Sequence, residues 1–429
     1  MNTVLEDLKV RGFYAQCTNP EGLSALMDRE PVTFYVGCDP TGTSLHIGHM
    51  VPYFAYRHLQ EAGHRGIALI GGGTARIGDP SGKTETRKML SYEQLDYNAQ
   101  RIYAQLDRFI GFNGNSTVSA NNKDWLSDLN YIDFLRDIGS HFSVNRMLRF
   151  EAYRARLETG LSFIEFNYQL LQSYDFLELY RRYGCLLQIG VDDQWGNIVA
   201  GTELVRRIEG IEVFGMTFPL ILTAEGKKMG KTEKGSVFLD PEMTSVYEFF
   251  QYWRNVSDAD IQRFLLMFTF LSVEECRALT APGTNPNEAK ERLAWEVCAL
   301  IHGKEEADTA MAGARAAFGG DGGDRSAMPT VKLQRAQFEQ GYPMADLFFD
   351  AGLSATKSEA RRLIQQGGAF FSKSAAPLQN SMTEEAALEA TLQAASSLEE
   401  KIYLNALNDA GELILRAGKK RYCRVTLSE

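Results

Sequence analysis

Short apolar runs alternate with polar turns and helical stretches in the first part of the chain. Residues 32–38 and 65–71 are apolar runs, and residues 50–60 between them repeat their apolar positions with helical spacing. A strand, a helix and a second strand in this order predict a βαβ unit of a parallel sheet. Ligands bind such sheets beyond the carboxyl ends of the strands, which is where the polar turns fall.

The pattern continues along the rest of the chain. Helical spacing recurs over 3–30, 92–112, 128–150 and 161–183, and the apolar runs 186–190 and 218–222 predict two more strands, the second being the last of the sheet. Residues 244–318 are helical throughout. A glycine-rich stretch near 319–326 predicts a linker, and a small α+β module follows from 343.

Composition narrows the class of protein. The 429 residues are enough for two to four domains, and the formal net charge of −10 provides no global basic field. A local basic patch for RNA remains compatible with that charge. The six cysteines form no CxxC pair, which argues against zinc and disulfides and favours a reducing cytosol. We find no signal peptide and no apolar stretch that would span a membrane.

The turn 39–49 joins the first strand to the first helix. Its free backbone N–H groups and the positive end of the helix dipole would suit a phosphate. His46 and His49 share one helix face, and Gly48 leaves room for a flat ring at the backbone. The turn therefore predicts a nucleotide site. The alternative is an ordinary helix start, capped by Thr43 or Ser44, with two incidental histidines.

Two further stretches carry polar groups that could complete such a site. The loop 228–232 has two lysines that could neutralise phosphates, although a solvated charged turn has the same sequence. Tyr168, Gln172 and Asp175 lie on one stripe of an otherwise apolar helix. Because burying them without partners is costly, they either bond one another or line a polar pocket.

Acidic and basic clusters follow later in the chain. Asp192 and Asp193 come directly after a predicted buried strand, where they could hold ribose hydroxyls or where Asp193 could cap the next helix. The C-terminal module carries a cluster of basic residues that suits an RNA backbone or a solvated surface. The cluster comprises Lys357, Arg361, Arg362, Lys373, Arg416, Lys419, Lys420, Arg421 and Arg424.

Together these stretches resemble a known family. His46-Ile-Gly-His49 and Lys228-Met-Gly-Lys-Thr232 are similar to the paired "HIGH" and "KMSKS" signatures of class I aminoacyl-tRNA synthetases. Further motifs resemble the bacterial-type tyrosyl-tRNA synthetases. They are Tyr35 with Gly37 and Asp39-Pro-Thr, Gly78-Asp79-Pro-Ser-Gly-Lys83, Tyr168-xxx-Gln172-xx-Asp175 and Gly190-xx-Asp193-Gln-Trp-Gly-Asn197. The resemblance runs in order along the whole chain, and residues 343–429 resemble an RNA-binding module of a ribosomal protein.

The resemblance implies a tyrosine–tRNA ligase. Such an enzyme activates L-tyrosine by in-line attack of its carboxylate on the α-phosphate of ATP, and then transfers tyrosine to tRNA(Tyr). The implied catalytic residues are His46, His49, Lys83, Arg87, Lys228, Lys231 and Thr232. The implied tyrosine-binding residues are Tyr35, Asp79, Tyr168, Gln172, Asp175 and Gln194. The implied ATP-binding residues are Gly37, Asp39, Thr41, Gly48, Gly190, Asp193 and Lys231, and those for tRNA are Lys357, Arg361, Arg362, Lys419, Lys420 and Arg421.

The resemblance also implies an architecture and partners. We expect an α/β fold in which a Rossmann-like parallel-sheet catalytic domain (1–232) has a helical insertion and dimer interface near 125–165. An α-helical anticodon-binding domain (233–320), a linker (321–342) and a small α+β RNA-binding domain (343–429) would follow. The enzyme would be a cytoplasmic homodimer with residues 134–150 at its interface. Mg²⁺ would arrive with ATP and need no protein-bound metal site.

Two positions depart from the family pattern. Val36 stands where cysteine is common, and Cys38 stands where phenylalanine is usual, so we expect no thiol contact to ribose and a small change in ATP affinity. Gly230 replaces the serine of the generic signature, as is common in this subset. Three alternatives remain: a tryptophan enzyme, to which Tyr35 with Asp175 is ill suited; a small-molecule adenylyltransferase; and an RNA-binding scaffold without catalysis.

Overall fold

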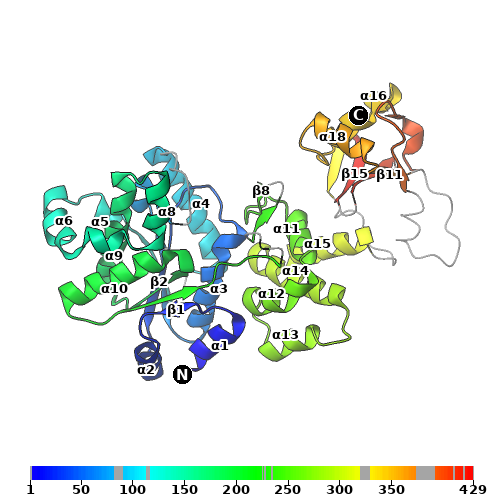
Figure 1. Cartoon of the computed structure of the whole chain (residues 1–429). Helices are drawn as coiled ribbons and strands as arrows, with labels where there is room; N and C mark the ends of the chain where they lie inside the picture. Colours follow the sequence, from blue (N-terminus) through cyan, green and yellow to red (C-terminus); the bar gives the residue numbers. More distant parts are fainter. Residues whose placement is uncertain are drawn as a thin grey trace. The chain divides into compact units, whose positions relative to one another are not determined.

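A computed structural model describes most of the chain (Figure 1). The described residues are 2–81, 90–112, 116–224, 226, 229–232, 235–318, 329–372, 392–408, 411–418 and 421–428. The chain divides into two compact units, of which unit 1 comprises Met1–Ser245 with Tyr252–Ile301 and unit 2 comprises Val246–Gln251 with His302–Glu429. None of the described helices is both long and apolar enough to cross a membrane.

Unit 1 is built on a six-stranded sheet in the order β1-β6-β5-β2-β3-β4. The strands are β1 (Gln16–Cys17), β2 (Thr33–Cys38), β3 (Arg65–Ile70), β4 (Thr117–Asn121), β5 (Leu187–Val191) and β6 (Phe214–Phe218). All neighbouring pairs are parallel except β1 with β6. The strand order changes direction at β2: β3 and β4 lie on one side of it, and β5 and β6 lie on the other. Such a switch point is where α/β sheets bind ligands.

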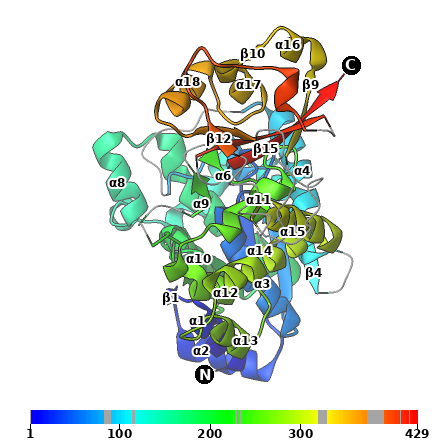
Figure 2. The same ribbon diagram turned by 90° about the vertical axis from the view of Figure 1, so that its right-hand side faces the viewer.

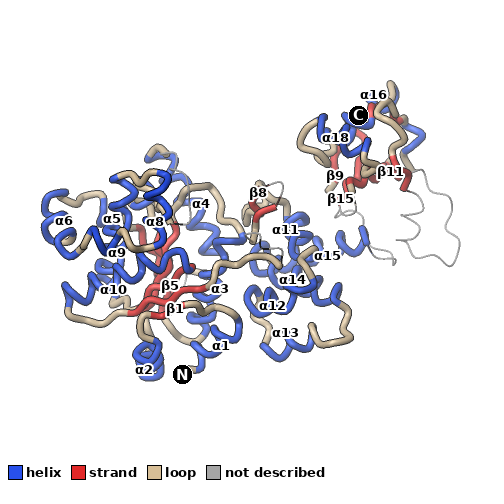
Figure 3. Tube along the Cα trace, viewed as in Figure 1, coloured by secondary structure: helices blue, strands red, loops and turns tan. Residues whose placement is uncertain are grey.

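Helices cover both faces of this sheet (Figure 3). Successive side chains of a strand point to opposite faces. On β2, the Phe34 ring lies 4.8 Å from Tyr56 of α3 (Ile47–Glu61), whereas the Tyr35 ring lies 5.3 Å from Phe176 of α9 (Phe163–Tyr183). The sheet is therefore buried on both sides, which explains why its strands read as continuous apolar runs.

The remaining elements of unit 1 are mostly helical. Before β6 they are α1 (Thr3–Arg11), α2 (Pro20–Arg29), α4 (Tyr92–Ile110), α5 (Lys123–Leu126), α6 (Tyr131–Asp137), α7 (Val144–Met147), α8 (Glu151–Thr159) and α10 (Trp195–Glu209). After β6 come the hairpin β7 (Lys231–Thr232) with β8 (Gly235–Ser236), and the helices α12 (Ile261–Phe268), α13 (Val273–Leu279) and α14 (Pro286–His302). Helix α11 (Val246–Arg254) contributes residues to both units.

Unit 2 contains α15 (Lys304–Phe318) and a small α+β module. A five-stranded sheet runs in the order β12-β11-β14-β15-β9, and in Figure 2 the helices α16–α18 lie together on one side of its strands. The strands are β9 (Thr330–Gln334), β11 (Ala369–Ser372), β12 (Leu392–Ala394), β14 (Glu412–Ala417) and β15 (Arg421–Ser428). The helices are α16 (Arg335–Glu339), α17 (Met344–Asp350) and α18 (Lys357–Gln365), and β10 (Tyr342–Pro343) pairs with β13 (Lys401–Ile402).

The α/β fold class is confirmed, with corrections to individual elements. The last strand expected at 218–222 is wrong: β6 is Phe214–Phe218, and Pro219, which has no N–H to donate, follows it. The single helical stretch expected over 128–150 is broken into α6, a 3-10 turn at Gly139–His141 and α7. The short strands β1 and β4 were not expected. Asp193 does not cap α10, because that helix begins at Trp195 with Gln194 at its N-cap position.

Candidate functional site

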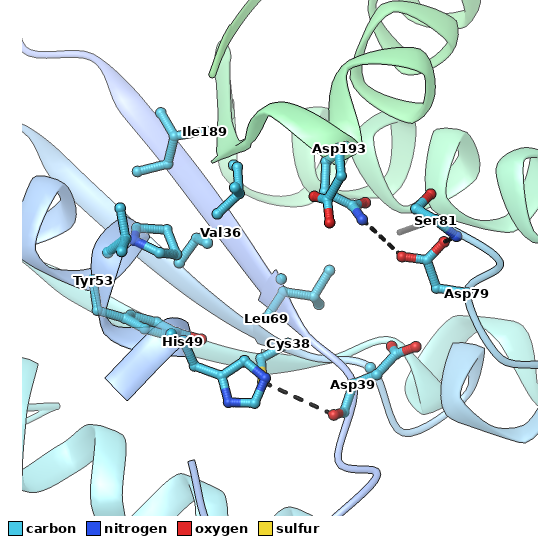
Figure 4. A pocket seen from close by; sticks show the side chains of 18 of the residues that line it. Val36, Cys38, Asp39, His49, Tyr53, Leu69, Asp79, Ser81, Ile189 and Asp193 are labelled. Atoms are coloured by element: carbon cyan, nitrogen blue, oxygen red, sulfur yellow. Dashed lines mark hydrogen bonds between the residues drawn. The ribbon is translucent and has the colours of Figure 1, made fainter. Parts of the chain in front are cut away.

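A cavity of about 590 Å³ opens at the switch point of the unit 1 sheet. The carboxyl ends of β2 and β5, the start of α3, one face of α9 and the loop after β3 all contribute to its wall. Figure 4 shows two sides of this cavity. One side is lined by Asp79, Ser81 and Asp193, and the opposite side by His49 and Tyr53. Between the two sides lie Asp39 and Leu69. The polar turns that follow separate strands in the sequence thus converge on one pocket.

The histidine turn forms one end of this pocket. His46 is the N-cap residue of α3, and its backbone N–H donates to His49 Nδ1 over 3.3 Å. The two imidazole rings stack with their centroids 3.8 Å apart. A Cβ on Gly48 would lie 2.9 Å from His46 Cε1, so glycine is what allows the His46 ring to pack against this turn. The turn thus presents two stacked imidazoles at the start of a helix, where the helix dipole favours an anionic ligand, although the Ile47 N–H itself donates to the Val237 carbonyl over 3.1 Å.

The second signature lies directly against the first. Gly230 has a φ of +79°, and a Cβ there would approach Gly48 N and Ile47 Cβ to 3.2 Å. Its N–H donates to the Tyr252 hydroxyl over 2.9 Å, and its carbonyl accepts from Val237 over 2.8 Å. Gly230 is therefore required both by its left-handed backbone and by the close approach to Gly48. The expected meeting of the two motifs occurs at the backbone.

The cations expected near the phosphates fall largely outside what the structure describes. Lys83 and Arg87 belong to 82–89, and Lys228 to 227–228, which lie outside the described residues. For Lys231 and Thr232 the structure gives the backbone, as strand β7, and not the side chains. The sequence predictions for these five residues therefore stay predictions.

The polar stripe of α9 lines the pocket, as one of the two alternatives expected. Tyr168, Gln172 and Asp175 all face the cavity. They bond residues of other elements: the Tyr168 hydroxyl donates to Asp39 Oδ2 over 3.0 Å, and Asp39 Oδ1 accepts from the Thr74 hydroxyl over 2.8 Å. The stripe is thus tied to the turn after β2 rather than to itself.

Tyr35 and Asp175 form the deepest end of the cavity, where both are almost fully buried. Asp175 accepts from Asn122 Nδ2 over 2.9 Å and from Trp125 Nε1 over 2.8 Å. Burial raises the pKa of the Asp175 carboxyl to about 8, against the opposing effect of these two hydrogen bonds. Burial and the nearby Asp175 charge raise the pKa of the Tyr35 hydroxyl well above its usual value. The Tyr35 hydroxyl has no hydrogen-bond partner in the described part of the chain.

A second polar group gathers around Asp79 at the side of the pocket. Asp79 Oδ1 accepts from the Ser81 N–H over 2.9 Å, and its Oδ2 accepts from Gln194 Nε2 over 2.7 Å. Gln194 Oε1 and Gln172 Oε1 both accept from Asn197 Nδ2, over 3.2 and 3.0 Å. A carboxylate and two amide oxygens thus lie close together on this side, which suits a cationic group.

The other expected pocket residues are also present. Gly37, Asp39, Thr41, Gly190 and Asp193 all line the cavity. The two adjacent acids, Asp192 and Asp193, have different surroundings. Asp193 is exposed at the pocket. Asp192 Oδ1 instead accepts hydrogen bonds from Gln16 Nε2 over 2.6 Å and from the Thr217 hydroxyl over 2.8 Å. Asp192 therefore connects β1 and β6 to the end of β5, and only one acid of the pair faces the site.

Several pocket residues were missed by sequence reasoning. Asn122 and Trp125 hold Asp175, Thr74 holds Asp39, and Gln188 lines the cavity with its buried Oε1 lacking a partner within the described ranges. Asn122 follows β4, a strand that the sequence pattern did not reveal. The two departures from the family, Val36 and Cys38, both line the pocket.

The basic cluster of the C-terminal module divides into groups. Arg361 and Arg362 are exposed on α18, beside Lys357, whose Nζ lies 2.8 Å from Asp346 Oδ1. Arg421 begins β15 and donates to the Leu353 carbonyl over 3.0 Å. By contrast, Arg416 is buried 4.1 Å from the Phe370 ring, and Arg424 pairs with Glu412. Lys373, Lys419 and Lys420 lie outside the described residues.

Comparisons with known proteins agree on one family. The family described as tRNA synthetases class I (W and Y) matches residues 27–319. The chain is 56% identical over 428 residues to a tyrosine–tRNA ligase of Treponema denticola, covering 100% of both chains. It is 57% identical over 425 residues to that of Treponema pallidum, covering 99% of this chain and 98% of the relative. A solved, C-terminally truncated mitochondrial tyrosyl-tRNA synthetase of Aspergillus nidulans is 28% identical, with a TM-score of 0.65 over 74% of this chain and 95% of its own.

Proposed function

The chain belongs to the bacterial-type tyrosyl-tRNA synthetases of class I, and we propose that the pocket of unit 1 carries out the chemistry of that family. The enzyme activates L-tyrosine with ATP to tyrosyl-adenylate and pyrophosphate, and then transfers tyrosine to tRNA. One observation supports this placement: a single cavity combines a buried polar end at Tyr35 and Asp175 with the two histidines at the start of α3.

The deep end of the pocket would select tyrosine. The Asp175 carboxyl offers an acceptor to the substrate phenol, and the Tyr35 hydroxyl, which lacks a described partner, offers a second hydrogen bond. Phenylalanine would leave both groups desolvated without a partner, which costs about 1–3 kcal/mol for each neutral group and more for a charged one. Tryptophan has an indole N–H but no acceptor for the Tyr35 hydroxyl.

The Asp79 side of the pocket would hold the substrate ammonium group. Asp79 supplies the negative charge, and Tyr168, Gln172 and Gln194 supply oxygen acceptors around it. With the phenol at one end and the ammonium at the side, the tyrosine carboxylate would be directed toward the histidine turn. Orientation of the two reacting groups in this way is a large part of the rate enhancement that such a site provides.

The histidine turn would hold the ATP phosphates. Attack of the tyrosine carboxylate on the α-phosphate displaces pyrophosphate, so negative charge builds on the phosphate oxygens. The His46 and His49 side chains and the positive end of the α3 dipole would stabilise that charge. Adenine would lie against Gly48, which lines the pocket. The residues proposed to contact ribose and phosphates are Gly37, Asp39, Thr41, Gly190 and Asp193. Lys83, Arg87, Lys228, Lys231 and Thr232 are the proposed additional groups at the pyrophosphate.

ATP is the energy source of this family, and we propose that Mg²⁺ arrives bound to its phosphates. Within the described ranges, no three His, Cys, Asp or Glu side chains gather as they would around a metal ion. Mg²⁺ typically keeps several waters and is shared between a carboxylate and substrate phosphates, which the acids at the pocket edge, Asp39 and Asp193, would permit.

ATP–pyrophosphate exchange with each amino acid in turn tests this function. We expect exchange with L-tyrosine and not with phenylalanine or tryptophan. Exchange that is absent with tyrosine, or equal with phenylalanine, would exclude the proposed role of the Tyr35–Asp175 end. Exchange with tryptophan alone would indicate the sibling specificity.

Recognition of tRNA is proposed for two parts of the chain. The helices after residue 233 would approach the anticodon, and α18 with the start of β15 would contact the RNA backbone through Lys357, Arg361, Arg362 and Arg421, together with Lys419 and Lys420. Deletion of 343–429 should leave pyrophosphate exchange unchanged and weaken tRNA charging. Loss of both activities would mean that the module is part of the catalytic fold.

A homodimer in the cytoplasm is the proposed working form. Large apolar side chains lie exposed between residues 131 and 164, where unpaired apolar surface favours association. They are Tyr131, Ile132, Leu135, Val144, Leu157, Phe163 and Ile164. All six cysteines are free thiols, as is usual in a reducing compartment. Sedimentation at micromolar concentration should give twice the chain mass of 48.0 kDa, and a monomer would rule out this interface.

A further inference from the structure

We propose that Asn197 is a positioning residue for the substrate ammonium group. It would act by fixing which end of the Gln172 and Gln194 amides faces the pocket. The inference rests on the proposed tyrosine-binding role of the Asp79 side of the cavity, and it adds a residue that does not itself line that cavity.

Asn197 lies in the first turn of α10 and is 5% exposed. Its Nδ2 lies 3.0 Å from Gln172 Oε1, 3.2 Å from Gln194 Oε1 and 3.5 Å from the Ser81 hydroxyl. One buried amide thus reaches three elements of the pocket wall: α9, the turn before α10 and the loop after β3. Each of these elements carries a residue proposed to surround the ammonium group.

The chemical sense of these contacts is fixed by the donor. A glutamine amide has two ends of nearly equal size, one an acceptor oxygen and the other an NH₂ donor. An NH₂ group only donates, so Asn197 Nδ2 requires an oxygen from each glutamine. Gln194 in turn directs its own NH₂ toward Asp79 Oδ2, at 2.7 Å, so the Asp79 carboxylate and Asn197 set the orientation of this amide together.

The orientation matters for a cationic ligand. A carbonyl oxygen has two lone pairs, so Gln172 Oε1 retains one for the substrate after accepting from Asn197. If Gln172 rotated by half a turn, its NH₂ would face the ammonium group donor to donor. If Gln194 rotated, its oxygen would face the Asp79 carboxylate. Asn197 disfavours both rotations, so the acceptors of the subsite are set before the substrate arrives.

The test compares two ligands in Asn197→Ala and Asn197→Leu, the second of which keeps roughly the volume and branching of the side chain. Replacement removes a hydrogen bond that orients an acceptor for a charged group, so we expect the dissociation constant of L-tyrosine to rise about tenfold. The KM of ATP should be unchanged. The deaminated analogue 3-(4-hydroxyphenyl)propionate, which keeps the phenol and carboxylate, should bind the variants and the parent enzyme equally.

Each outcome is decisive. Equal losses for tyrosine and the analogue in both variants would show a merely structural role for Asn197, and no loss for either would show no role; both overturn the proposal. The matched control is Thr202→Ala on the same helix, whose hydroxyl bonds only the Val199 carbonyl in the described part of the chain, and it should change neither constant. The parent enzyme is assayed first, because absent exchange with tyrosine there would refute the proposed function rather than this inference.

Discussion

The two ends of the pocket are built in different ways. At the tyrosine end, buried side chains of a strand and a long helix are held by further side chains, as Asp175 is by Asn122 and Trp125. At the end proposed for the ATP phosphates, the close contacts are made by backbone: Gly48 lies at a helix start, and Gly230 packs closely against it.

This difference matches the tasks that we propose for the two ends. Selecting a phenol over a phenyl ring requires polar groups that are desolvated and fixed before the substrate arrives, because their cost when unpaired is the source of discrimination. Stabilising phosphate charge requires many donors near one point, which a helix start supplies without regard to side-chain identity. Substitutions at the two ends should therefore affect different kinetic constants.

The largest effect is expected at the phosphate end. His46→Ala or His49→Ala should lower kcat for pyrophosphate exchange about 100-fold or more, because a donor aimed at developing charge is removed. The dissociation constant of tyrosine should be unchanged, since neither imidazole reaches the Tyr35–Asp175 end. Pre-steady-state formation of tyrosyl-adenylate measures both quantities. A weakened tyrosine constant with normal kcat would contradict the division of the pocket.

The next effect is expected at the tyrosine end. Asp175→Ala should lower kcat/KM for tyrosine by about two orders of magnitude, because it removes a buried acceptor, leaves Trp125 Nε1 without one and leaves Asn122 Nδ2 with the Thr74 hydroxyl alone. It should also narrow the preference for tyrosine over phenylalanine in the exchange assay. Asp192→Asn is the matched control, because Asp192 bonds Gln16 of β1 and Thr217 of β6 and so connects strands of the sheet. Unchanged kinetics in Asp175→Ala would remove this residue from the pocket.

A smaller effect tests the contact between the two signatures. Gly230→Ala places a Cβ 3.2 Å from Gly48 N on a backbone with φ of +79°. The strain of about 1–2 kcal/mol should lower kcat for exchange about tenfold without changing tyrosine binding. Gly226→Ala separates the causes, because Gly226 has a φ of +76° and a Cβ there would meet no described atom within 4 Å. Equal losses in both variants would assign the effect to backbone strain alone.

The phosphate end was the easier half to predict from sequence. The turn 39–49 is one continuous segment, so its helix start, its two histidines and its glycine can all be recognised together in the sequence. The loop around Gly230 is equally local, and both motifs meet as expected. A site formed by the backbone can be predicted from a short segment, because a helix start and a positive φ depend on neighbouring residues.

The tyrosine end was only half predicted, for a physical reason. The stripe Tyr168, Gln172 and Asp175 follows helical period and could be found. Their partners Asn122, Trp125 and Thr74 are brought in by tertiary packing, and Asn122 follows β4, whose half-buried sequence has no clear period. The strand placed at 218–222 failed similarly, because the five residues of β6 end before Pro219.

The last prediction concerns stability rather than catalysis, namely the pH dependence that Asp175 contributes. Its folded pKa is raised to about 8 from the ordinary 3.8, chiefly by burial. Between these values the folded state holds a proton that the unfolded state has lost, so stability must fall as pH rises through this window. For one proton the slope is at most about 1.4 kcal/mol per pH unit.

Urea unfolding of the parent enzyme and Asp175→Asn at pH 5 to 9 measures this contribution. Asparagine does not titrate, so the difference in unfolding free energy, parent minus variant, should decrease from pH 5 to pH 8 and level off above. Asp175→Asn also replaces one carboxyl oxygen that accepts a hydrogen bond, which lowers the stability of the variant by an amount that does not depend on pH. This loss shifts the difference in unfolding free energy at every pH equally and leaves its slope against pH unchanged. A difference that is flat across the range would show that Asp175 is already ionised when the pocket is empty. The hydrogen bonds from Asn122 and Trp125 would then be what keeps this carboxyl charged in the folded protein.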